Sequence, residues 1–175
     1  MKNESIRVSD LEALILGKKG EEKYFELVNI LSSDILLNPK FDRNRDFIQH
    51  GSSSIYEHCI YVAMESLYLA DRFNIKCDLV SLTRGALLHD YFLYDWHNKT
   101  SRLPHHAYKH PIYALKNAKK DFNLNKREKN IIASHMFPLC FIIPRCKEAL
   151  IVSLADKIST LKERKLHKKK SKLAR

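Results

Sequence analysis

The chain has 175 residues, of which 45% are hydrophobic, and a formal net charge of +11. This length and composition suit one globular domain whose core needs no disulfide or structural metal, and they argue against a second full domain. No apolar run approaches the length of a membrane span, so we expect no membrane-spanning helix.

The positive charge is concentrated at the C-terminal end. Residues 161–175 hold eight Lys or Arg and one Glu, so they carry +7 of the +11. We therefore expect a domain of residues 1–160 and a basic tail of residues 161–175. We interpret the tail as a solvated helix end; the alternative is an electrostatic arm for nucleic acid, an anionic membrane or an acidic partner. Nucleic acid is not the favoured partner, because the tail has no aromatic side chain that could stack on bases.

The four cysteines are Cys59, Cys77, Cys140 and Cys146, and they form no Cys-x-x-Cys pair. Cys59 and Cys140 lie in apolar surroundings, which is typical of reduced cysteines in a protein core. The first residues lead into a polar stretch without the apolar segment of a secretion signal. These features together predict a cytoplasmic protein.

Hydrophobic periodicity predicts the helices of the first half of the chain. A short helix is expected over residues 9–16, and a longer one from residue 21 that stops before Pro39. Residues 40–54 are polar and are expected to form a loop. The serines at the end of this loop are suited to cap the next helix, expected over residues 55–73.

Capping residues place further helices in the second half. Asp78 is expected to cap a strongly apolar helix, and Asn125 followed by Glu128 predicts a capping box. Residues 91–109 show no regular pattern and are expected to form an ordered loop. The predicted fold is therefore all-α, with six or seven helices and no sheet.

Several charged or imidazole side chains stand where core residues are expected. His58 shares one side of its helix with Ile55 and Val62, although a lone histidine there is more typical of a satisfied core residue. Asp90 follows an apolar run, and burying an ionised aspartate is costly unless it is paired or binds a metal. The alternative is that Asp90 pairs with Arg84 or with a backbone group.

The chain resembles the HD superfamily of metal-dependent phosphohydrolases. The resemblance covers residues 46–161 and consists of His58, the adjacent pair His89 and Asp90, and the distant Asp156, each in an apolar helical context. It implies a compact helical bundle around a metal site that these four residues form.

Two further histidines match a second feature of the superfamily. Members with two metal ions take extra histidines from the part of the chain that here holds His110 and His135. Pro111 is expected in the first turn of a helix, which places His110 at the N-terminus of that helix. The resemblance implies that both histidines bind a second ion with Asp90 as the bridge. The alternative is that both histidines hydrogen-bond a phosphate beside a single ion.

Imidazole and carboxylate ligands without thiolate suit Mn, Fe, Co, Ni or Zn as divalent ions. Such an ion lowers the pKa of bound water and polarises a phosphoryl oxygen. The resemblance therefore implies hydrolysis of a phosphoester by metal-activated water, with Asp90 and Lys157 as catalytic residues. Lys157 is also the best candidate to bind the substrate, and the weaker candidates are Arg84, Asp95 and His106.

The resemblance says less about the substrate. The chain lacks the long insertions of alarmone hydrolases, and Asp90 is followed by Tyr91, Phe92 and Leu93 in place of the Gly-Tyr-Pro signature of the cyclic-dinucleotide branch. A small phosphorylated metabolite or nucleotide is the remaining choice. The alternatives are a two-iron oxygenase on the same fold, and a catalytically silent HD scaffold with a basic nucleic-acid-binding tail.

Overall fold

The computed structural model describes residues 5–15, 17–50, 53–98 and 106–173; the side chains of residues 12, 14, 50, 106, 107 and 169–173 are not described. Within these residues the fold is all-α, as predicted, and consists of helices and one pair of very short strands. In chain order the elements are η1 (Val8–Leu14), α1 (Gly20–Leu31), α2 (Ser33–Leu36), α3 (Pro39–Asp42), η2 (Arg43–Asp46), β1 (Ile48–His50), β2 (Ser53–Ser54), α4 (Ile55–Arg72), α5 (Leu79–Leu88), α6 (His106–Asp121), α7 (Lys126–Ser134) and α8 (Lys147–Leu173).

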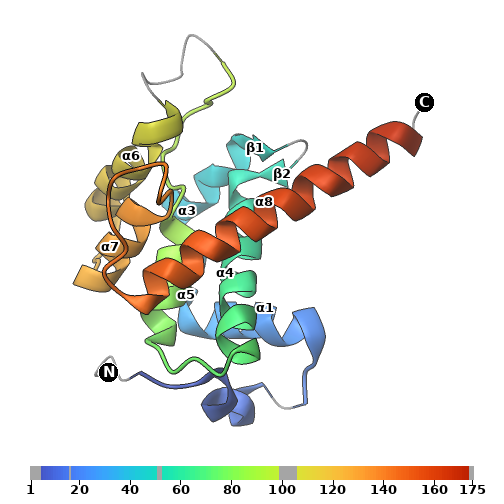
Figure 1. Ribbon diagram of the computed structural model, residues 1–175, viewed down its shortest axis with the longest axis vertical. Coiled ribbons are helices and arrows are strands. Elements are labelled where there is room, and N and C mark those ends of the chain that lie inside the picture. Colours follow the sequence, from blue (N-terminus) through green and yellow to red (C-terminus); the bar gives the residue numbers. More distant parts are fainter. Residues whose placement is uncertain (1–4, 16, 51–52, 99–105, 174–175) are drawn as a thin grey trace.

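Helix α4 lies at the centre of the bundle and packs against α1, α5 and α8. Helix α7 packs against α5, α6 and α8, so the four helices α4, α5, α7 and α8 enclose a common interior. Helix α8 crosses the bundle obliquely, and its C-terminal part projects beyond the other elements (Figure 1). Among the described helices, none combines the length and the apolar composition that crossing a membrane requires.

The predicted capping residues start the helices that carry the candidate site. Ser54 and Glu57 form a reciprocal capping box at the start of α4. The Asp78 carboxylate accepts from the Ser81 amide at the start of α5. The Asn125 side chain caps α7 with the help of Glu128, as the sequence indicates. Each cap satisfies backbone N–H groups that lack a partner within the helix, and so fixes where the helix begins.

Gly85 sets the distance between α5 and α7. A Cβ atom at this position would lie 2.6 Å from Cδ1 and 2.9 Å from Cβ of Ile131 on α7. The two helices can approach this closely only because residue 85 has no side chain. Since α5 leads into His89 and α7 leads into His135, this packing also sets the spacing between the two histidines.

The expectations of no sheet and of a helix that begins at Pro111 were wrong. Residues 48–54 include an antiparallel strand pair, β1 and β2, in which Ile48 pairs with Ser54. Helix α6 begins at His106, so Pro111 lies inside it and His110 is not at its N-terminus. Such short strands have no detectable alternation. The helix start was missed because the residues that precede Pro111 are polar and show no apolar period.

The basic tail is not a separate segment. Helix α8 runs continuously from Lys147 to Leu173, so the expected boundary at residue 161 falls inside a helix. Glu163, which the tail was expected to include, is only 8% exposed. All four cysteines are free thiols.

Candidate metal centre

The six predicted metal ligands lie together in the interior of the bundle. His58 comes from α4, His89 and Asp90 from the end of α5, His110 from α6, His135 from the end of α7, and Asp156 from α8. All six are buried, with exposed fractions between 0% and 8%. We refer to these six residues as the metal cluster.

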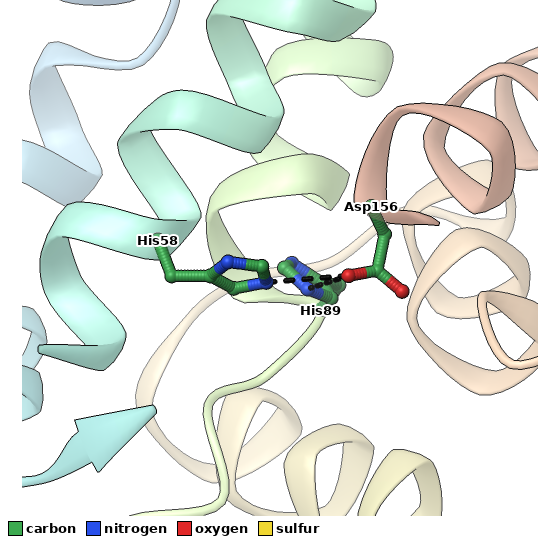
Figure 2. A group of neighbouring side chains, drawn as sticks. All are labelled: His58, His89 and Asp156. Atoms are coloured by element: carbon green, nitrogen blue, oxygen red, sulfur yellow. Dashed lines mark hydrogen bonds and ion pairs between the residues drawn. The ribbon is translucent and has the colours of Figure 1, made fainter. Parts of the chain in front are cut away.

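One half of the metal cluster consists of His58, His89 and Asp156. Nε2 of His58 lies 3.2 Å from Oδ1 of Asp156, and Nε2 of His89 lies 3.8 Å from the same oxygen. The three side chains point toward one another from three different helices (Figure 2). Their ligand atoms all lie within 4.8 Å of one another, which is close enough for one ion to contact all three.

The other half consists of His110 and His135, whose Nε2 atoms are 2.9 Å apart. Asp90 lies between the two halves. Its Oδ1 is 3.3 Å from Nε2 of His110 and 3.5 Å from Nε2 of His135. Its Oδ2 is 3.4 Å from Nε2 of His89 and 3.9 Å from Nε2 of His58. One carboxylate oxygen therefore faces each half, which is the arrangement that a bridging ligand needs.

Backbone carbonyls orient two of the imidazoles. Nδ1–H of His89 donates to the carbonyl of Ala86 over 2.7 Å, and Nδ1–H of His135 donates to the carbonyl of Ile132 over 2.9 Å. With the proton on Nδ1, the neutral ring presents the lone pair of Nε2 to the centre of the cluster. Hydrogen bonds of this kind commonly fix the tautomer of a metal-binding histidine.

Two residues that sequence reasoning missed hold members of the cluster. Oε1 of Glu163 lies 2.8 Å from Nδ1 of His58. Gln49 on β1 donates to Oδ2 of Asp90. Glu163 stands seven residues after Asp156 on the same helix, a spacing that places both on one face and could have revealed it. Gln49 lies in a polar stretch, and no sequence pattern distinguishes it.

The surrounding charges control protonation of the histidines. Burial disfavours a charged imidazole at His58, but hydrogen bonds to Asp156 and Glu163 outweigh it and raise the pKa of His58 to about 10. Burial acts in the same way on His89. There the negative charge of Asp90 prevails and raises the pKa of His89 well above its ordinary value.

The carboxylates are held in their charged form. Burial would raise the pKa of Asp90, but the neighbouring histidines, His89 foremost, lower it to about 2. Burial also opposes ionisation of Asp156, but hydrogen bonds from His58 and His89 lower its pKa well below the ordinary value. By contrast, burial and the charge of His89 lower the pKa of His135 to about 3, so this imidazole is neutral.

The donor set fits a divalent transition metal. Nε2 of His89 and Oδ1 of Asp90 are buried and make no hydrogen bond with the described residues. Buried polar atoms of native proteins nearly always have a partner, and those without one need an explanation such as a bound ion. Imidazole nitrogens and carboxylate oxygens in this number are the ligands that such an ion prefers.

The remaining candidates lie in different surroundings. The Lys157 ammonium donates to the carbonyls of His135 and Ser153 over 3.3 and 2.9 Å, so it lies beside the metal cluster, and burial lowers its pKa. Arg84 uses its guanidinium nitrogens to bind Glu128, Asp34 and the carbonyl of Asn123, none of which belongs to the cluster.

Asp95 and His106 are the last two candidates. Asp95 has a side chain that is 45% exposed and accepts from the backbone amide of His97. The side chain of His106 lies outside the described residues, although its backbone starts α6.

Aromatic side chains follow Asp90, and one of them packs against His110. The Phe92 ring lies 5.9 Å from the imidazole of His110 and 4.9 Å from the ring of Tyr94, measured between centroids. Burial and the charges of Tyr113 and Asp90 raise the pKa of Tyr94, so this phenol stays protonated near the cluster.

The fold and the cluster define a class of protein: a helical domain with a buried group of histidines and carboxylates that could hold metal ions. Comparison with protein families identifies it further. The sequence model of the HD domain matches residues 55–161, more than half of the chain, and the protein therefore belongs to the HD domain family. This family consists in general of metal-dependent phosphohydrolases. Searches of the curated proteins and of the solved structures find no match.

Proposed function

We propose that the protein is a metal-dependent phosphohydrolase that acts on a small phosphorylated metabolite or nucleotide. The observation that supports this most is the position of Asp90, which has one oxygen facing His58 and His89 and the other facing His110 and His135. A carboxylate so placed can join two ions, and paired ions are a common device for displacement at phosphorus.

His58, His89, Asp90 and Asp156 would hold one ion, and His110 and His135 would hold a second one together with Asp90. A bound divalent ion lowers the pKa of its water ligand and polarises a phosphoryl oxygen. Other residues of the protein orient the ligands of these ions. Glu163, for example, fixes the ring of His58 by accepting from its Nδ1.

Lys157 is the residue that we assign to stabilising negative charge. Its ammonium is half-buried and lies next to Asp156 in the chain, while its hydrogen bonds hold it against the end of α7. A cation that is partly removed from water interacts more strongly with a phosphoryl oxygen than an exposed one does. Arg84 is not part of the proposed site, because the groups that its guanidinium binds lie outside the metal cluster.

Elemental analysis and a phosphatase screen test the proposal together. Protein purified without chelator is analysed for bound metal and then assayed for phosphate release from phosphomonoesters and nucleotides with Mn, Fe, Co, Ni or Zn. We expect up to two ions per chain and hydrolysis that chelation abolishes. A stoichiometry that stays at one ion under saturating metal would instead assign His110 and His135 to phosphate binding. Oxygen consumption without phosphate release would point to a two-iron oxygenase.

Asp90→Ala should reduce hydrolysis to background, because it removes a ligand from both halves of the cluster. The matched control is Asp10→Ala, at an exposed aspartate on η1. The control should keep full activity. If Asp90→Ala retains activity while its circular dichroism spectrum is unchanged, the catalytic centre lies elsewhere.

A further inference from the structure

A cavity of about 750 Å³ lies between α1, α4 and the C-terminal half of α8. This volume falls in the range of sites for small molecules, roughly 300–1,000 Å³. None of the six metal-cluster residues lines it, so it is a separate space. Its lining includes four glutamates, Glu21, Glu57, Glu65 and Glu163, and three tyrosines, Tyr24, Tyr61 and Tyr68.

The lining is acidic although the protein is basic. Four glutamates line the cavity, and Lys162 is the one lysine or arginine among its described lining residues. The ammonium of Lys162 lies 2.6 Å from the carboxylate of Glu65, so its charge is already compensated. An anionic ligand would be repelled from this space, and a phosphorylated substrate is therefore not its occupant.

Glu163 is the most buried of these carboxylates. It is 8% exposed and pairs through Oε1 with His58, while Oε2 has no hydrogen-bond partner among the described residues. A buried carboxylate normally has both oxygens compensated, since removal from water is costly. Oε2 itself is buried, so a positive charge in the cavity that Glu163 lines would be attracted to this carboxylate across a short distance without contacting Oε2.

Tyrosine rings form the other part of the lining. Tyr61 and Tyr68 on α4 are 51% and 40% exposed, and the ring of Tyr24 meets the ring of Tyr68 edge to face at 5.8 Å. Aromatic faces combined with carboxylates are the groups that proteins use to bind organic ammonium ions. We propose that this cavity binds a small organic ammonium ion, at a site distinct from the metal cluster.

Choline serves as the probe, and its uncharged carbon isostere serves as the control ligand. Binding to the full chain is measured by calorimetry at constant ionic strength. We expect choline to bind and the isostere to bind at least about tenfold more weakly, because it lacks the charge. Inorganic phosphate, offered with metal to occupy the metal cluster, should not displace choline.

The variants Tyr61→Ala and Tyr68→Ala should each weaken choline binding by about three- to tenfold, which corresponds to the loss of one aromatic contact. Tyr108→Ala, at a 62% exposed tyrosine on α6, is the control and should bind choline normally. The proposal is overturned if choline and its isostere bind equally, if neither binds, if phosphate displaces choline, or if the tyrosine variants keep full affinity. Each of these results leaves the proposed hydrolase untouched, since none measures hydrolysis.

Discussion

At the scale of single residues, the metal cluster shows how charge can be kept in an apolar interior. Asp156 lies 3.2 Å from His58, and His58 in turn lies 2.8 Å from Glu163. The chain of alternating carboxylate and imidazole compensates each buried charge with the next. Removing one member leaves its neighbour buried and unpaired, and that is more costly than losing the contact alone.

Glu163→Ala should weaken metal binding by about 10- to 100-fold, the usual effect of removing a group that orients a metal-binding histidine. Glu163→Gln keeps an oxygen that can accept from Nδ1–H of His58, so it should lose less. Calorimetric titration with Mn or Zn measures both. Glu22→Gln, at a glutamate with a side chain that is 67% exposed, is the control and should bind metal normally. Equal affinity of Glu163→Ala and the native protein would contradict the assigned role.

Metal binding should release protons and strengthen as pH rises. The pKa of His58 is raised to about 10 and that of His89 is also raised, so both are protonated at neutral pH when no metal is bound. A metal ion takes only the neutral imidazole, and each displaced proton makes the logarithm of the affinity rise by about one per pH unit. Titrations in buffers of different ionisation enthalpy count the protons. Affinity that does not change between pH 6 and 8 would show that both rings are neutral beforehand.

At the scale of helices, sequence patterns predicted the elements that carry strong apolar periods and caps. Polar or charged side chains at positions where α4, α5 and α8 should bury apolar residues indicated His58, Asp90 and Asp156 as candidate metal ligands. The contact of Gln49 with Asp90 was not predicted because a strand of three residues is too short to show a hydrophobic period. The role of Glu163 was not predicted because the residue lies within a run of basic residues, and such a run is typical of a solvent-exposed helix face.

Gly85→Ala tests the packing of α5 on α7. In an ordinary helix interior this change stabilises, since alanine has the better helix propensity. Here the added methyl would overlap Ile131, so we expect a loss of about 1–3 kcal/mol in the free energy of unfolding. Urea denaturation measures it. Combining the change with Ile131→Val removes the nearest atom and should recover part of the loss. A more stable Gly85→Ala variant would mean that the helices separate without cost.

Truncation within α8 tests where the domain ends. We expected from the sequence a domain of residues 1–160, but Glu163, which follows it, contacts His58. We therefore propose that the HD domain extends past Glu163. A chain that ends at residue 160 should bind metal more weakly, while one that ends at residue 167 should keep native affinity and hydrolysis. If the two truncated chains bound metal with equal affinity, the result would support a domain that ends at residue 160.

At the scale of the whole molecule, positive and negative charge are concentrated in different places. The chain carries +11, and much of this charge lies on the part of α8 that projects beyond the other elements (Figure 1). The cavity beside α4 is acidic, and the metal cluster combines charges of both signs. Anions and cations that approach the protein are therefore directed to different places on its surface.

The metal cluster also imposes an order of events during synthesis. His58 and Asp156 are 98 residues apart in the chain, and His58 and Glu163 are 105 apart. Closing so long a loop is entropically costly and is a late step in folding. While the chain emerges from the ribosome, the half of the cluster that consists of His58, His89 and Asp156 cannot be completed before residue 156 has been made. An ion held by His58, His89, Asp90 and Asp156 would therefore be bound only after α8 has packed on α4, and it would then stabilise the fold by mass action.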